Sequence, residues 1–270
     1  LTGYDQRAHA FAFSALFFWL AGFPDQAIAN AQIAVEEADA AQHFDSIVIA
    51  QCMHAWVLLM RREFADAERS AEEAVAISKR QKLSFLEGFA RTMWGLANSA
   101  VSEDSGGIEE YRSGCKIMYD AGARFFSSAI LASGAETCLR AGDPDAAGSA
   151  LEIALMVKDE LGERCWEAEI QRLSGEISLE RENGSEAEAE RHFLGALQTA
   201  QSQGAKSFEL RAAMSLARLW QKQGKRQDAL ELLGPVRDWF SEGLDTGDLK
   251  DASSLLQALS KTKTSASVSD

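Results

Sequence analysis

A short motif that recurs about every forty residues limits the possible folds of this chain more than any other feature. In each copy a glycine is followed, after four intervening residues, by an alanine that opens an acidic, amphipathic stretch. The clear copies begin at Gly22, Gly142, Gly184 and Gly224. The last three glycines are 42 and 40 residues apart, and the first precedes the second by 120 residues, which is three periods of 40. Degenerate copies stand near residues 62 and 102. A period of this length is typical of helical-repeat proteins, in which each repeat is a pair of helices.

A second break in the helical pattern alternates with the first. It begins at His43, Lys82, Gly122, Gly162 and Gly204, at intervals of 39 to 42 residues. Glycine favours these positions because it tolerates the left-handed conformation that ends a helix. Pro24 and Pro144 suit the first turn of a following helix, where the missing N–H costs nothing. Each repeat is therefore predicted to be helix, short turn, helix, short turn.

These breaks predict an all-α, right-handed superhelical solenoid of about six stacked helical hairpins and a capping helix. We expect one domain over residues 1–260, because no linker interrupts the pattern. The predicted hairpins span 4–43, 44–82, 83–122, 123–162, 163–204 and 205–243, and the cap spans 245–260. Residues 261–270 carry no apolar pattern, and we expect them to be disordered.

The charge of the chain argues against two classes of partner. It has 27 basic and 41 acidic residues and a formal net charge of −14. Affinity for nucleic acid comes from neutralising phosphates with lysine and arginine, and anionic membranes attract the same residues. We therefore expect neither partner. The most apolar run, residues 11–23, is shorter than the roughly 20 residues that span a bilayer, so we interpret the chain as cytoplasmic.

Signatures of catalysis are missing from the sequence. There is no phosphate-binding GxxxxGK[ST] loop, no dinucleotide-binding GxGxxG, no HExxH and no GxSxG. The four cysteines form no CxxC pair, and Cys52, Cys138 and Cys165 lie in stretches that we interpret as buried helix. We predict no catalytic residue, no metal site and no cofactor in this chain.

Charged residues on two otherwise apolar first helices are the candidate binding residues. Glu169, Arg172 and Glu176 stand at i, i+3 and i+7 and so share one helix face, as do Arg211 and Arg218. First helices of neighbouring hairpins lie side by side on the concave surface of a solenoid, so these residues can form a ladder. One interpretation is a set of ion pairs in a solvated groove, each worth about 0–1 kcal/mol. The other is a groove that captures a charged peptide or ligand.

Three segments carry a resemblance to a known family. They are Gly162–Glu176 (GERCWEAEIQRLSGE), Gln203–Trp220 and Pro235–Leu249. They resemble the C-terminal, tetratricopeptide-like (TPR-like) region of bacterial proteins that carry a class III adenylate/guanylate cyclase domain and an AAA-type ATPase module. Related tails occur in ATPase transcription factors similar to the maltose regulator. The resemblance implies a sensory or scaffolding arm of a larger signalling protein, with no catalytic residue of its own.

Two functions follow as hypotheses. The first is a non-catalytic interaction module whose concave groove binds a protein segment or a neighbouring domain. The second is a small-molecule sensor, with aromatic residues of the first repeats lining an inducer pocket. These aromatic residues include Phe17, Trp19, Phe23, Trp56 and Trp94. In the other interpretation they form core together with a surface that packs on an upstream domain, and an N-terminal repeat exposed in this way can form a homodimer.

Overall fold

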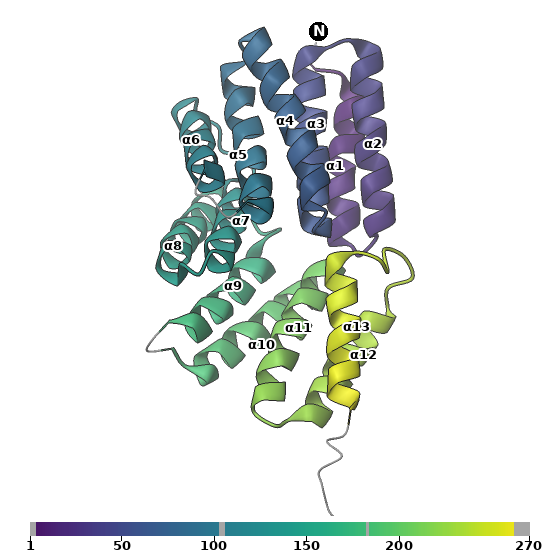
Figure 1. The fold of residues 1–270 in the computed structure, drawn as a ribbon, viewed down its shortest axis with the longest axis vertical. Helices are drawn as coiled ribbons and strands as arrows, with labels where there is room; N and C mark the ends of the chain where they lie inside the picture. The colour runs from purple at the N-terminus through teal and green to yellow at the C-terminus, as the bar shows by residue number, and fades with distance from the viewer. Residues whose placement is uncertain (1–3, 103–105, 182–183, 262–270) are drawn as a thin grey trace, which may run out of the picture.

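The computed structural model describes residues 4–102, 106–181 and 184–261, and over these ranges the chain is all-α. The described residues form thirteen helices, of which α1 to α12 follow one another as six antiparallel pairs and α13 stands last (Figure 1). Their bounds are α1 Gln6–Leu20, α2 Pro24–Ala41, α3 Phe44–Arg61, α4 Phe64–Gln81, α5 Ser84–Val101, α6 Gly106–Asp120, α7 Ser127–Arg140, α8 Pro144–Leu161, α9 Glu167–Glu180, α10 Glu186–Gln203, α11 Lys206–Lys222, α12 Arg226–Asp238 and α13 Gly247–Ser260. The prediction of an all-α solenoid of stacked hairpins is confirmed.

The turns follow the local chemistry of the motif. Gly22, Gly142 and Gly224 adopt φ of 91°, 77° and 81°, which places them in the region that an L-side chain rarely occupies. Pro24 and Pro144 are the first residues of α2 and α8. Each predicted repeat contains one consecutive pair of helices, and the predicted cap contains α13.

The two helices of a pair differ in burial. First helices such as α3 and α11 are buried on several sides, because each packs between its own partner and the neighbouring pairs. Second helices such as α4 and α10 bury a narrow stripe of alanines and larger apolar residues and expose their acidic faces. The first helices therefore form the inner layer of the solenoid.

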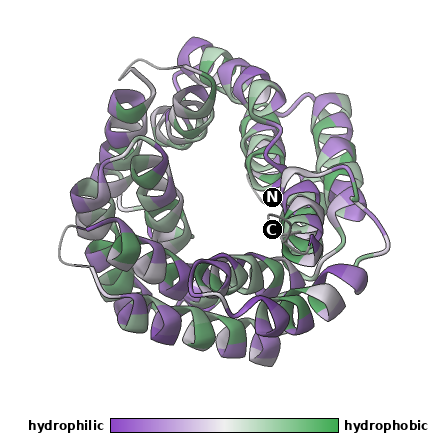
Figure 2. Cartoon of the chain, turned by 60° about the horizontal axis from the view of Figure 1, so that its bottom comes forward, coloured by the Kyte–Doolittle hydropathy of each residue, from purple (hydrophilic) through white to green (hydrophobic). Residues whose placement is uncertain are grey.

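The solenoid closes on itself (Figure 2). The end of α1 meets the start of α11: the rings of Trp19 and Phe208 lie 5.5 Å apart, and the Ser207 hydroxyl donates to the Trp19 carbonyl oxygen at 2.5 Å. Farther out, Phe23 packs on Trp239 with a ring-centre distance of 5.7 Å. Trp19 is thus a core residue, as one part of the interpretation expected. Phe23 does not wait for an upstream domain, because the C-terminal repeat of the same chain packs on it.

The segment between α12 and α13 completes this closure. Glu242 accepts hydrogen bonds from the backbone N–H groups of Asp25 and Gln26 at 3.0 and 3.1 Å, at the start of α2. In return, the Gly243 N–H donates to the Asp25 carboxylate at 2.9 Å. Gly243 has φ of 64°, and its Cα lies so close to Pro24 that an added Cβ would collide with the ring. We call these contacts, together with those of Trp19 and Phe23, the end-to-end contact.

The three cysteines that were assigned to buried helix differ in exposure. Cys52 and Cys138 are buried, whereas Cys165 is exposed and precedes α9, so its assignment to a buried helix is wrong. The predicted disordered tail lies outside the described residues except for Lys261. None of the described helices combines the length and the apolar character needed to cross a membrane.

Candidate functional site

A cavity of about 320 Å³ opens on the concave side of the solenoid. Its walls come from the inner helices α3, α5, α7, α9 and α11, and from α13. The rings of Trp56, Trp166 and Phe208 form one wall and contact one another in sequence, with centres 5.5 and 5.4 Å apart. The lining also includes nine charged residues: its arginines are Arg62, Arg140, Arg172, Arg211 and Arg218, and its acids are Glu136, Glu169, Asp248 and Asp251. An acidic chain thus presents more arginines than carboxylates in this cavity.

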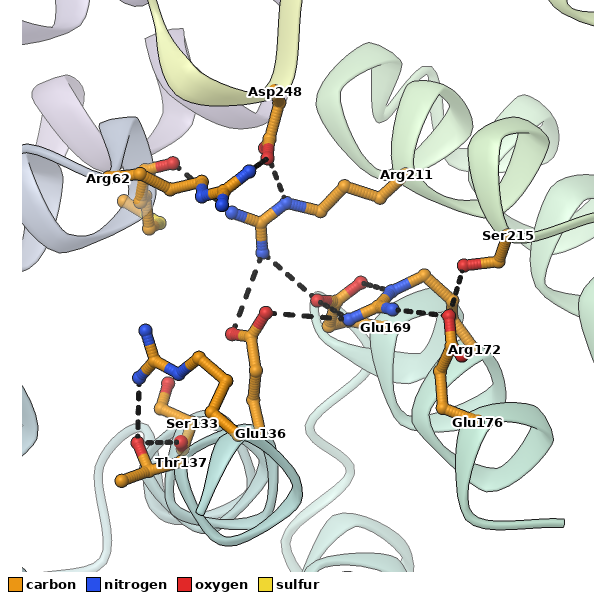
Figure 3. Close-up of polar contacts among 12 residues, drawn as sticks. Arg62, Ser133, Glu136, Thr137, Glu169, Arg172, Glu176, Arg211, Ser215 and Asp248 are labelled. Carbon is orange, nitrogen blue, oxygen red and sulfur yellow. Dashed lines mark hydrogen bonds and ion pairs between the residues drawn. The ribbon is translucent and has the colours of Figure 1, made fainter. Parts of the chain in front are cut away.

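Glu169 lies at the centre of the charged wall (Figure 3). Its two carboxylate oxygens each accept a hydrogen bond from Arg172 at 2.9 Å, and one of them also accepts from Arg211 at 3.0 Å. Burial alone would raise the pKa of this carboxyl group. The two guanidinium groups outweigh that effect and lower the pKa from 4.5 to about 2.

Arg211 connects this network to the end-to-end contact. Its guanidinium donates to Asp248 on α13 at 2.7 Å and to the Met60 carbonyl oxygen on α3 at 3.1 Å. It also lies 5.0 Å from the centre of the Trp19 ring on α1. Burial opposes the charge, but the carboxylates of Asp248 and Glu169 raise the pKa of Arg211 above its ordinary value. Through this one side chain, α11 therefore contacts α1, α3, α9 and α13 at the edge of the cavity.

Arg172 extends the network along α9. Its guanidinium donates to Glu176 at 3.2 Å and lies 3.6 Å from the Glu136 carboxylate on α7. Glu176 also accepts a hydrogen bond from the Ser215 hydroxyl on α11 at 2.5 Å. The structure thus brings together four of the five predicted residues, Glu169, Arg172, Glu176 and Arg211.

Arg218 does not join this group. It pairs with Asp251 on α13 at 3.9 Å, and the same carboxylate receives Arg62 at 2.5 Å. Both arginines are substantially exposed, so we assign little energy to these pairs.

The centre of the ladder is not a solvated groove. Glu169, Arg172 and Arg211 are only 3%, 8% and 8% exposed. The interpretation as weak surface ion pairs is therefore wrong for these three residues, because α7 and α13 cover them. Removing one member of such a buried group leaves an uncompensated charge, which typically costs about 3–5 kcal/mol.

Sequence reasoning missed five charged residues of the cavity: Glu136, Arg140, Arg62, Asp248 and Asp251. Glu136 and Arg140 stand at i and i+4 on α7, a spacing that places them on the same face of a first helix. Applied to α7, the argument used for α9 and α11 would have found them. Arg62 occupies a repeat turn in left-handed conformation, and no comparable local pattern pointed to it.

Histidine, cysteine and carboxylate side chains do not gather as they do in metal sites: across the described ranges, no three of them could hold a metal ion together. Most charged groups of the cavity are paired with one another, Arg140 being the exception among the described residues.

Comparisons with known proteins define the fold alone. No family model and no curated protein matches the sequence. Among solved structures, the apo form of RapI is similar, with a TM-score of 0.60, 12% identity, and coverage of 94% of this chain and 82% of that one. The TPR2AB domain of yeast Sti1, in a complex with pHSP90, aligns with a TM-score of 0.38 and 14% identity over 94% of this chain and 98% of that one. The similarity to RapI shows that the fold of this chain is a TPR-like helical solenoid, and the resemblance to cyclase–ATPase proteins stays a prediction.

Proposed function

We propose that this chain is a non-catalytic interaction module whose concave cavity binds a short segment of a protein. The observation that carries the proposal is the cavity itself, with an aromatic wall beside a charged wall. Glu169, Arg172 and Arg211 hold one another in place, so the charged wall is ordered before any ligand arrives. A rigid site loses less conformational entropy on binding than a flexible one, which favours affinity.

The two walls suit the two parts of a peptide. The rings of Trp56, Trp166 and Phe208 offer apolar surface to a side chain, while the arginines and carboxylates offer hydrogen-bond partners to a backbone or to polar groups. TPR-like solenoids are generally protein-interaction domains, and the fold of this chain agrees with that use.

We further propose that the module is the regulatory arm of a larger bacterial signalling protein with a cyclase domain and an AAA ATPase module. This context depends on the sequence resemblance of residues 160–250. The arm would regulate its neighbour only if the cavity binds one state of that neighbour more tightly than the other, since equal affinity shifts no equilibrium. Truncating the arm from the intact protein should then change its regulation, and unchanged activity and regulation would refute the idea.

The alternative is a small-molecule sensor, and the size of the cavity favours it. A volume of about 320 Å³ lies at the lower end of the roughly 300–1,000 Å³ of small-molecule pockets. Of the aromatic residues expected to line an inducer pocket, Trp56 lines this cavity, whereas the phenylalanines of the first repeat do not. A homodimer, in turn, would have to use residues that stay exposed, such as Phe17 and Phe44.

Filling the cavity tests the proposal. A displayed library of random peptides is selected against the chain, and the enriched peptides are then measured on two tryptophan variants. Ser133 lines the cavity on α7, whereas Ser149 is exposed on α8, and each hydroxyl donates to the carbonyl oxygen four residues before it. We expect Ser133→Trp to weaken binding at least ten-fold and Ser149→Trp to change it less than two-fold.

A gentler pair of variants covers the case in which Ser133→Trp fails to fold. Bound peptide should slow alkylation of Ser133→Cys and leave that of Ser149→Cys unchanged, as mass spectrometry can show. If no peptide is enriched, or if the enriched peptides bind Ser133→Trp as well as the unmodified chain, the proposal is wrong. A rise in Tm with nucleotides or sugars, without peptide enrichment, would favour the sensor.

A further inference from the structure

We propose that Arg140 is the anchor for a single anionic group, a carboxylate or a phosphate, of the ligand that enters the cavity. This inference rests on the proposed binding function and names the chemistry of the ligand.

Arg140 differs from the other cavity arginines in its partners. Its guanidinium donates to the Thr137 hydroxyl at 3.1 Å and lies 5.0 Å from the centre of the Phe64 ring. Within the described residues it forms no ion pair with a carboxylate, whereas Arg172 and Arg211 each contact more than one. The positive charge of Arg140 is thus the unmatched charge of the wall.

The surroundings of Arg140 are unfavourable for a cation. The side chain of Arg140 is exposed in the mouth of the cavity, but the protein around it removes part of its hydration and lowers the pKa of Arg140. Glu136 acts in the opposite direction, and the charges of Arg211 and Arg62 lower the pKa again. Arginine does not lose its proton in proteins, so Arg140 offers a full positive charge to an anion that enters the cavity.

The nearby carboxylate does not supply the missing partner. Glu136 faces the other two arginines of the network and lies 3.6 Å from Arg172 and 3.9 Å from Arg211. An incoming oxyanion can instead accept two parallel hydrogen bonds from the planar guanidinium of Arg140, the geometry that arginine offers to carboxylates and phosphates.

The remaining lining limits the ligand to one such group. Glu136, Glu169, Asp248 and Asp251 share the cavity, and a second anionic group would meet them at short range. Like charges at short range repel each other, and more strongly beside protein than in bulk water. The ligand should therefore carry one anion and an apolar part that reaches the aromatic wall.

The test uses inorganic phosphate and N-acetylglycine as probes, with N-acetylglycinamide as the uncharged control. Each is titrated at constant ionic strength while nuclear magnetic resonance follows the arginine Nε–H signals. We expect a saturable shift of the Arg140 signal with at least one anion and none with the amide. Tighter binding of phosphate would identify a phosphoryl ligand, and tighter binding of N-acetylglycine would identify a carboxylate.

Variants assign the effect to this side chain. Arg140→Met should weaken anion binding at least ten-fold and Arg140→Lys less, because lysine keeps the charge but loses the fork of donors. Arg191→Met, at an arginine that is 73% exposed on the outer helix α10, should change it less than two-fold. Because Arg140→Met removes the Nε–H group itself, anion binding to each variant is followed through a backbone amide signal of the cavity wall.

Two outcomes would overturn the inference. One is the absence of saturable anion binding, and the other is anion binding that survives in Arg140→Met. Failure of this inference can be told apart from failure of the proposed function. Peptides that bind the cavity without any acidic group, and bind Arg140→Met equally well, would refute the anion site and leave the interaction module intact.

Discussion

The substitution Glu169→Gln tests whether the centre of the charged wall stabilises the fold. The ordinary pKa of this carboxyl group is 4.5, and in the folded chain it falls to about 2. One pKa unit corresponds to about 1.4 kcal/mol, so the ionised group stabilises the folded state by about 3 kcal/mol near neutral pH. Glutamine keeps the shape but removes the charge that compensates Arg172 and Arg211. We therefore expect Glu169→Gln to lower the free energy of unfolding by about 3 kcal/mol at pH 7.

The dependence on pH makes this prediction sharper. Because the pKa of Glu169 is lower in the folded state, its contribution is complete above the unfolded pKa of 4.5 and is lost as the pH falls through the folded pKa of about 2. The difference between the unmodified chain and Glu169→Gln should thus shrink from about 3 kcal/mol at pH 7 to about 1 kcal/mol at pH 3. Urea denaturation followed by circular dichroism at several pH values measures it.

A control and a refuting result complete the experiment. Glu188 is 49% exposed on α10, where it faces Arg191 at 3.8 Å, so Glu188→Gln should cost less than about 0.5 kcal/mol at every pH. A cost of Glu169→Gln that is below about 1 kcal/mol at pH 7, or that is the same at pH 7 and pH 3, would refute the reasoning.

Two further predictions concern the end-to-end contact and the thiols. Gly243→Ala should lower the free energy of unfolding by about 1–3 kcal/mol more than Gly204→Ala. Both glycines have φ near 65°, but only Gly243 packs against Pro24. Equal losses in urea denaturation would show that this contact contributes nothing. In the native chain Cys165 should react rapidly with a thiol reagent, since it is exposed, whereas Cys52 should react only after unfolding, because it is buried and burial raises the pKa of its thiol. Mass spectrometry after alkylation identifies the modified residues, and rapid labelling of Cys52 would contradict the packing of α3.

Arg211 has a consequence for how binding and closure are related. It contacts Glu169 in the cavity wall, and it also reaches Met60 and Trp19 across the end-to-end contact. A ligand that binds to the charged wall therefore contacts a network whose member Arg211 also joins the two ends of the solenoid.

The sequence by itself determined where the helices begin and end. Gly22, Gly142 and Gly224 adopt positive φ, and Pro24 and Pro144 open helices, because these preferences depend on the residue and its immediate neighbours. The same local geometry, 3.6 residues per turn, correctly placed Glu169, Arg172 and Glu176 on one helix face. Such signals act over a few residues, so they can be read without knowing the rest of the chain.

Only the tertiary structure decided that the solenoid closes and that the ladder is buried. Arg211 and the Met60 carbonyl oxygen are 151 residues apart in sequence, and their contact depends on small packing angles that accumulate over all the intervening helix pairs. No periodicity encodes that accumulated angle. Glu169 is buried because Arg211 reaches it from α11 and α7 packs beside α9, and Arg140 has no carboxylate partner among the described residues because those carboxylates pair elsewhere. Partner choice and burial in this cavity are thus properties of the assembled helices and not of any single helix.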